Sequence, residues 1–93
     1  MKVEILYFAE LKEITGKDKE SFSLNDSKLL ELINALFIKY DSIKKLIWEE
    51  NKKKLKKNVS IVLNDEIVNH NNKLSIKLSE GDKIAFLLPL SGG

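Results

Sequence analysis

An amphipathic helix near the middle of the chain constrains the fold most strongly. Apolar side chains recur there at intervals of three and four residues, which places them on one face of an α-helix: Leu29, Leu32, Ile33, Leu36, Phe37 and Tyr40. Residues 25–27, Asn-Asp-Ser, precede this run and are of the types that cap helix N-termini. We predict one main helix over about residues 28–40. Because one apolar stripe covers one face of a small sheet, we expect a single helix packed across a few strands.

Strand-like segments lie on both sides of this helix. Residues 2–8 alternate, with Val3, Ile5 and Tyr7 on one face. A helical turn over residues 9–15 ends at Gly16, because Gly is preferred just past a helix. Residues 41–57 indicate no more than a further turn of helix. The expected strands are residues 2–8, 21–24, 59–63, 66–68 and 83–88.

The order of these elements indicates the fold class. A first pair of strands, a helical crossover and further strands allow the first and last strands to lie parallel at the centre of one sheet. This is the β-grasp, or ubiquitin-like, arrangement: an α+β fold with a mixed sheet of four to five strands and one main helix. Ninety-three residues suit a single core. We therefore expect one domain over residues 1–88, followed by an extended tail over residues 89–93.

The tail Pro89-Leu90-Ser91-Gly92-Gly93 is the segment that points most directly to a function. Gly lacks a Cβ atom, so a Gly-Gly end can enter a narrow slot, while Pro89 stiffens the exit from the last strand. Five extended residues reach ~17 Å. A carboxylate at Gly93, with a pKa of about 3.5, is an anion near pH 7 and reacts only after activation. We expect the tail to carry this carboxylate into another protein; the alternative is a solvated terminus.

The rest of the chain lacks the parts of an independent catalyst. The absence of Cys excludes disulfides, thiolate nucleophiles and Cys-based metal sites. His70 is the only histidine, lies in an Asn-rich loop and is expected to be solvated, so we predict no metal site. Ser91 has no base within sequence reach and is interpreted as a spacer. Any chemistry at Gly93 must therefore be performed by other proteins.

The charge distribution disfavours nucleic acid as a partner. The net charge is +2, but residues 41–57 hold seven Lys against one Asp and two Glu, a net charge of +4. All sixteen basic residues are Lys, so the forked guanidinium that suits phosphates and base edges is missing. The Lys-rich stretch 52–57 is interpreted as a solvated loop or helix end. Without a membrane-length apolar run or a signal-peptide pattern, we expect a cytoplasmic protein that does not bind membranes.

Three segments resemble a known family, the small subunit of molybdopterin synthase, which is a sulfur carrier. The first is Lys2-Val3…Leu6-Tyr7-Phe8-Ala9-Glu10-Leu11…Glu13…Thr15-Gly16, and the second is Asn64-Asp65-Glu66-Ile67-Val68. The third and most specific is Gly81-Asp82-Lys83-Ile84-Ala85-Phe86-Leu87-Leu88-Pro89-Leu90-Ser91-Gly92-Gly93. Leu88-Pro89 departs from the Pro-Pro common in the family, which leaves the carboxylate chemistry untouched.

The resemblance implies a carrier whose reactive group is its terminal carboxylate. In the family, an ATP-dependent, E1-like adenylyltransferase adenylates the position that matches Gly93, and a sulfur donor converts it to a thiocarboxylate. The tail, matching Pro89, Leu90, Ser91 and Gly92, then inserts into the large synthase subunit. Sulfur passes to cyclic pyranopterin monophosphate and builds the molybdopterin dithiolene. The carrier would bind no cofactor itself, ATP would be used by the activating enzyme, and catalytic residues are expected on the large subunit.

A surplus of apolar side chains predicts a docking surface next to the tail. Phe8 and Leu87 are expected on neighbouring parallel strands, on the face away from the helix, with Ile67 nearby. Residues 9–16 could cover them, or they could form a patch that binds a partner. The resemblance favours the second account, because the matching positions in the family contact the large subunit.

Three other functions remain open from the sequence. A sulfur carrier for the thiazole of thiamine shares the Gly-Gly end, but is usually shorter and lacks the Tyr-Phe-Ala-x-Leu opening. A ubiquitin-like modifier joined to lysines of target proteins is a different class of function, and no internal residue excludes it. The third is a plain binding module with an incidental tail.

Overall fold

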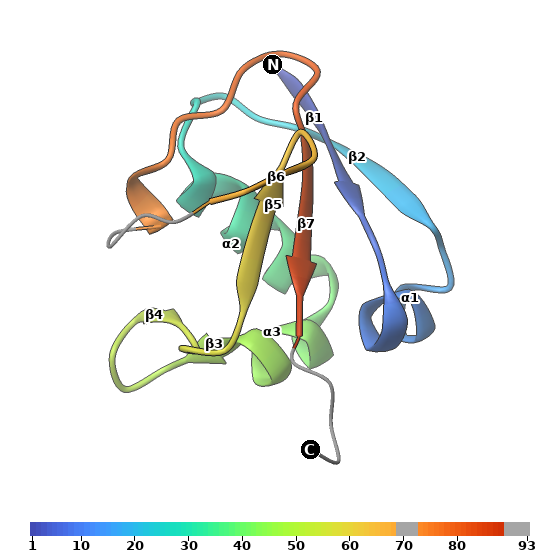
Figure 1. The fold of residues 1–93 in the computed structure, drawn as a ribbon, viewed down its shortest axis with the longest axis vertical. Coiled ribbons are helices and arrows are strands. Elements are labelled where there is room, and N and C mark those ends of the chain that lie inside the picture. The colour runs from blue at the N-terminus through green and yellow to red at the C-terminus, as the bar shows by residue number, and fades with distance from the viewer. Residues whose placement is uncertain (69–72, 89–93) are drawn as a thin grey trace.

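A mixed five-stranded sheet forms the centre of the computed structural model, which describes residues 1–68 and 73–88 (Figure 1). The strand order is β2-β1-β7-β5-β6; β1 and β7 run parallel, and the other neighbours run antiparallel. The first and last strands therefore lie side by side inside the sheet, which confirms the predicted β-grasp fold. The strands are β1 (Lys2–Leu6), β2 (Lys19–Ser23), β5 (Ser60–Leu63), β6 (Glu66–Ile67) and β7 (Lys83–Leu87).

Helices α1 and α2 agree with the sequence pattern, and residues 41–57, which it left unclear, contain one helix and two short strands. The helices are α1 (Ala9–Thr15), α2 (Leu29–Lys39), α3 (Asp41–Ile47) and the short 3-10 helix η1 (Lys73–Ser75). After α3, the strands β3 (Trp48–Glu49) and β4 (Lys54–Leu55) form a small antiparallel hairpin. The predicted loop at 69–72, which contains His70, lies outside the described residues.

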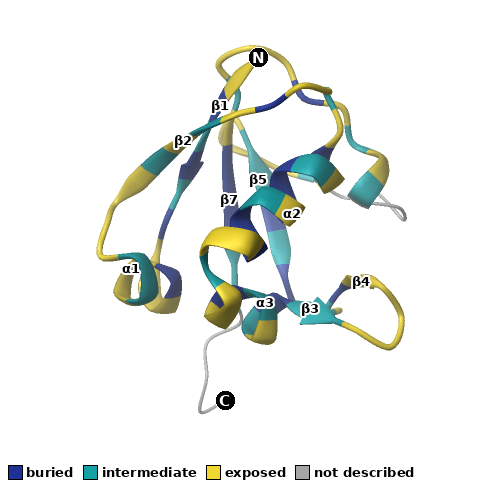
Figure 2. Cartoon of the chain, turned by 180° about the vertical axis from the view of Figure 1, so that it is seen from behind, coloured by how far each residue is buried: buried dark blue, intermediate teal, exposed yellow. Residues whose placement is uncertain are grey.

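The core lies between α2 and one face of the sheet, as Figure 2 shows from behind. Ile5 pairs with Ile84, and Phe86 pairs with Ile61, so these four side chains point to the same side of the sheet. All four are buried. The helix fills the space above them with its own buried residues, Leu29, Leu32, Ile33, Leu36 and Phe37. The apolar stripe of α2 therefore packs against one face of the sheet, as its spacing predicted.

The start of α2 differs from the expectation that residues 25–27 would cap it. Lys28 occupies the cap position and makes no side-chain cap hydrogen bond. The Glu31 carboxylate instead accepts the backbone N–H groups of Asn25 and Asp26, each at 2.8 Å. The polar residues therefore form the turn that leads into the helix, and a carboxylate from its first turn holds them.

A polar cluster ties β2 to β1 and α2 beside the core. The Glu20 carboxylate accepts hydrogen bonds from the hydroxyls of Tyr7 at 2.8 Å and Tyr40 at 2.9 Å. Lys17 and Lys39 also donate to it. Burial alone would raise the pKa of Glu20, but the bonds from Lys39, Tyr7, Tyr40 and Lys17 outweigh it and lower the pKa to about 2. Burial and the bond to Glu20 raise the pKa of Tyr7.

This cluster predicts a specific pH dependence of stability. Because the pKa of Glu20 falls below its ordinary value on folding, its contribution is present above about pH 4.5 and is lost as the pH falls toward 2. We expect Glu20→Gln to lower the free energy of unfolding by about 1–3 kcal/mol at pH 7, since the hydrogen bonds to a charged group are weakened. Urea unfolding at pH 7 and pH 2.5 measures this. The gap to wild type should shrink to about a quarter of its pH 7 value at pH 2.5, because the folded-state pKa of Glu20 is about 2.

The exposed Glu13 on α1 provides the matched control, because Glu13→Gln makes the same chemical change outside the cluster. It should alter stability by less than about 0.5 kcal/mol. A Glu20→Gln gap of the same size at both pH values would contradict the predicted role of the Glu20 charge.

Candidate functional site

The sheet face turned away from α2 carries an unbroken row of apolar side chains. Leu6 pairs with Ala85, Ala85 with Val62, and Val62 with Ile67. Because residues paired across neighbouring strands share a face, these four side chains cross β1, β7, β5 and β6 in one line. No second helix covers this face among the described residues (Figure 1).

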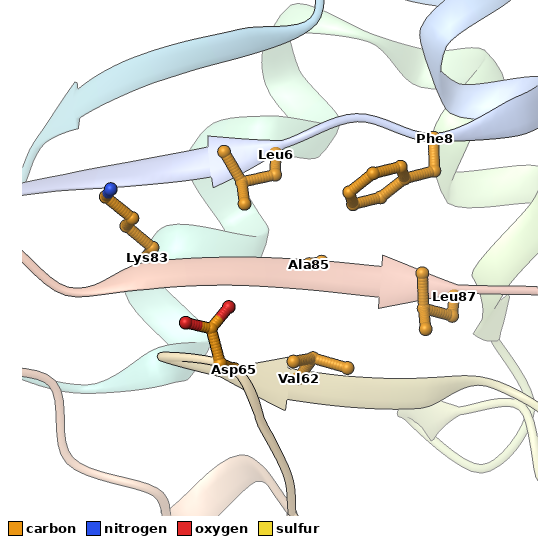
Figure 3. Close-up of a pocket in the computed structure, with 7 residues that line it drawn as sticks. All are labelled: Leu6, Phe8, Val62, Asp65, Lys83, Ala85 and Leu87. Carbon is orange, nitrogen blue, oxygen red and sulfur yellow. The ribbon is translucent and has the colours of Figure 1, made fainter.

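Phe8 and Leu87 turn this row into a hollow. Each lies two residues beyond a member of the row, Leu6 or Ala85, and so returns to the same face. With Val62, these residues line a concavity of about 430 Å³, shown in Figure 3. Phe8 is 50% exposed, and α1, which begins at the next residue, buries Leu11. Residues 9–16 therefore leave half of the Phe8 surface uncovered.

One end of the hollow is charged. Asp65 and Lys83 lie at the end away from Phe8 and Leu87 (Figure 3). Asn64 and Asp65 both have positive φ, at 49° and 71°, and form the turn between β5 and β6. The Asn64 side chain fixes this turn to β7 by accepting the Lys83 N–H at 2.9 Å. The hollow therefore has a rigid floor, an apolar end and a polar end.

The structure brings together two of the three predicted docking residues. Phe8 and Leu87 face the same hollow. Ile67 lies on the same face at the outer strand β6, beyond Val62; it is 64% exposed but does not line the hollow. The tail residues Pro89, Leu90, Ser91, Gly92 and Gly93 lie outside the described residues. Their attachment is nevertheless defined, because the tail begins two residues after Leu87.

Sequence reasoning missed part of the lining. Val62 lies in a nearly continuous apolar run, where alternation between faces cannot be read, and only the strand register assigns it to this side. Ala85 was already expected there, because it lies two residues before Leu87 in the last strand. Asp65 and Lys83 appeared as ordinary turn and strand residues. The sequence could have indicated them only by position: Asp65 lies in the turn between β5 and β6, and Lys83 is the first residue of β7.

The hollow is suited to binding rather than to catalysis. Of the residues that line it, Asp65 and Lys83 are the charged ones, and the others are apolar. Within residues 1–68 and 73–88, no group of three or more His, Cys, Asp or Glu is placed to hold a metal ion. In the same part of the chain, no helix combines the length and apolar character needed to cross a membrane. An apolar side chain of a partner protein is the ligand that such a hollow accommodates best.

Comparison with known proteins places this chain among carriers and modifiers. The sequence model of the ThiS family matches residues 5–93. The molybdopterin synthase sulfur carrier subunit of Chlamydomonas reinhardtii is 32% identical over 97 residues, which cover 100% of both chains.

Solved structures show the same fold. The small archaeal modifier protein 1 of Methanosarcina acetivorans superposes with a TM-score of 0.84 at 28% identity, over 99% of this chain and 96% of that one. In Helicobacter pylori, subunits 1 and 2 of the molybdopterin-converting factor form a protein–protein complex; one of its chains matches this one with a TM-score of 0.62 at 27% identity, over 100% of both. The chain therefore belongs to the ThiS family, as a sulfur carrier or a small modifier protein built on the β-grasp fold.

Proposed function

We propose that this protein is the sulfur-carrying small subunit of molybdopterin synthase. The observation that carries the proposal is that β7 lines the apolar hollow with Ala85 and Leu87, and that the Gly-Gly tail follows this strand in the sequence after Leu88. A partner seated on the hollow is therefore positioned to receive the tail. The 32% identity to the sulfur carrier subunit of Chlamydomonas reinhardtii over the full chain supports the same assignment.

The chemistry takes place at Gly93 and needs partners. A carboxylate oxygen of Gly93 attacks ATP on an E1-like adenylyltransferase, which releases pyrophosphate and leaves an acyl-adenylate. A sulfur donor then displaces AMP and leaves a thiocarboxylate, which is a carried sulfur nucleophile. The large synthase subunit holds it against cyclic pyranopterin monophosphate. Each carrier delivers one sulfur and is released by water as a carboxylate, so that two carriers in turn supply the two sulfur atoms of the dithiolene. Because activation consumes ATP, we place the carrier in the cytoplasm; the carrier itself binds no cofactor.

The hollow supplies the docking energy for these steps. Each large apolar side chain that a partner buries there contributes about 1.5–3 kcal/mol, and Phe8 offers a half-exposed aromatic ring for that contact. Ile67 extends the same face toward β6. Docking on this face holds the tail near the partner's cleft, so that positioning lowers the barrier to sulfur transfer.

A second function, protein modification, is favoured by one specific observation. The structural match to the modifier protein of Methanosarcina acetivorans, with a TM-score of 0.84, is closer than the match to the Helicobacter pylori chain, at 0.62. In that role the activated Gly93 carboxyl would form an isopeptide bond with a lysine amine of a target. A thiamine-type carrier would use the same thiocarboxylate with a different acceptor.

Reconstitution with the large subunit separates these roles. The mixture contains the carrier, its adenylyltransferase, ATP, a sulfur donor, the large subunit and cyclic pyranopterin monophosphate. We expect a dithiolene product that depends on every component. Lysine conjugates without that product would favour the modifier and contradict the proposal.

A further inference from the structure

The Lys-rich stretch 52–57 belongs to a small hairpin, and most of its lysines are exposed to solvent, as expected from the sequence. We call residues 48–57 the lysine hairpin; it contains β3 and β4. The Trp48 ring packs edge-on against the Phe37 ring of α2, with centroids 5.5 Å apart, and Leu55 is buried. The Lys56 N–H donates to the Ile47 carbonyl at 2.8 Å. These contacts hold the hairpin against the helical side of the core.

Both carboxylates of the hairpin form ion pairs with nearby lysines, and the hairpin keeps a net positive charge. The Glu50 carboxylate forms ion pairs with Lys53 at 3.1 Å and with Lys44 of α3 at 3.2 Å. The hydrogen bond from Lys53, followed by that from Lys44, lowers the pKa of Glu50 to about 2. Glu49 pairs with Lys52 at 3.8 Å.

The surplus charge comes from lysines outside these pairs. Lys54 and Lys57 are both exposed, and neither forms an ion pair with a carboxylate of the described residues. The outer surface of the hairpin is therefore a fixed positive patch.

This patch lies at the end of the sheet where β7 ends. Ser60 pairs with Leu87 in the antiparallel β5–β7 ladder. Lys57 comes three residues before Ser60 and therefore lies beyond Leu87, past the end of β7 at which Leu87 lines the hollow. Figure 1 shows the hairpin and this end of β7 at the same end of the sheet.

We propose that the lysine hairpin steers the large subunit onto the apolar face by attraction to an acidic surface beside that subunit's tail-receiving cleft. The inference rests on the proposed function, because it names the surface chemistry of the same partner. Exposed lysines in water act over about one Debye length, ~8–10 Å, and raise the rate of encounter more than the final affinity. The predicted signature is thus a salt-dependent association rate.

An acidic protein surface fits the patch better than a nucleic acid. The chain has no Arg, and its net charge is only +2. Stacking on bases requires accessible aromatic rings, whereas the Trp48 ring packs on Phe37 and its Nε1–H donates to Glu50 at 3.1 Å. The hairpin therefore offers charge without base recognition.

The test measures association with the purified large subunit by stopped-flow or surface plasmon resonance at 50 and 500 mM salt. The variant Lys54→Glu/Lys57→Glu reverses two exposed charges of the hairpin that form no ion pair with the described carboxylates. The control Lys28→Glu/Lys77→Glu makes the same charge change at two exposed lysines that form an isolated β-bridge just before α2, outside the hairpin. At 50 mM salt we expect kon to fall about tenfold for the hairpin variant and less than about threefold for the control, with koff nearly unchanged. The hairpin effect should largely disappear at 500 mM.

Several results would overturn the inference. These are equal slowing by both variants, no slowing by either, or tighter binding of the wild type to single-stranded poly(dT) than to the large subunit. If the wild type did not bind the large subunit at all, the proposed function would be overturned as well. Failure of the inference alone is thus distinguishable from failure of the proposed function. Thermal unfolding of each variant verifies that the fold is retained.

Discussion

Deletion of Gly93 is expected to stop dithiolene formation in the reconstituted system, with a loss of at least about 10³-fold. Shortening the tail by one residue moves its carboxylate back by ~3.4 Å. Since a misplacement of 1 Å can cost ~10²-fold in rate, neither the adenylation step nor the sulfur transfer step should tolerate this change. Product formation from cyclic pyranopterin monophosphate measures the loss.

The variant Ser91→Ala controls for this deletion because it keeps the length of the tail and removes only a hydroxyl. We expect its activity to remain within about threefold of wild type, since Ser91 is interpreted as a spacer. Normal cofactor synthesis in cells that carry the Gly93 deletion would show that the reactive group lies elsewhere.

The second large effect is expected at the hollow. Phe8→Asp and Leu87→Asp, made separately, should each raise the Kd for the large subunit about 100-fold, because each places a carboxylate in an apolar contact without a partner. Phe8 is already 50% exposed, so its substitution should cost the fold less than about 1 kcal/mol. Isothermal titration calorimetry gives the affinity, and thermal unfolding reports the stability.

Ile38 on α2 allows a matched control. It is 87% exposed and belongs to the helix on the opposite side of the sheet, so Ile38→Asp makes the same kind of change away from the hollow. Its affinity for the large subunit should equal that of wild type. Unchanged affinity in both hollow variants, or an equal loss in all three, would remove the hollow as the docking site.

Much of the fold could be predicted from local patterns. The stripe from Leu29 to Phe37 identified α2, and the alternation of Val3 and Ile5 identified β1, because each pattern has the period of its element. The parallel pairing of β1 with β7 followed from the order of the elements and their connections. These features depend on sequence spacing alone.

Other features depend on contacts between distant residues. The hairpin of β3 and β4 has only two residues in each strand, too few for a readable alternation, and its position depends on the packing of Trp48 against Phe37. The turn before α2 is held by Glu31, six residues after Asn25. Neither arrangement has a local signature.

The candidate site divides in the same way. Phe8 and Leu87 could be predicted because they are apolar side chains on the strand face that is not needed to form the core. Val62 could not, since its strand is apolar at nearly every position and only the register between β5 and β7 reveals its direction. The lysine hairpin was visible as charge, but its order and its place beside β7 emerged from tertiary contacts.

Intact-mass spectrometry of the protein, after incubation with ATP, its adenylyltransferase and a sulfur donor, tests the central claim most directly. A thiocarboxylate at Gly93 predicts a mass gain equal to sulfur minus oxygen, which requires ATP and maps to the C-terminal peptide. An unchanged mass, or a gain that maps to an internal residue, would contradict the account of this protein as a sulfur carrier.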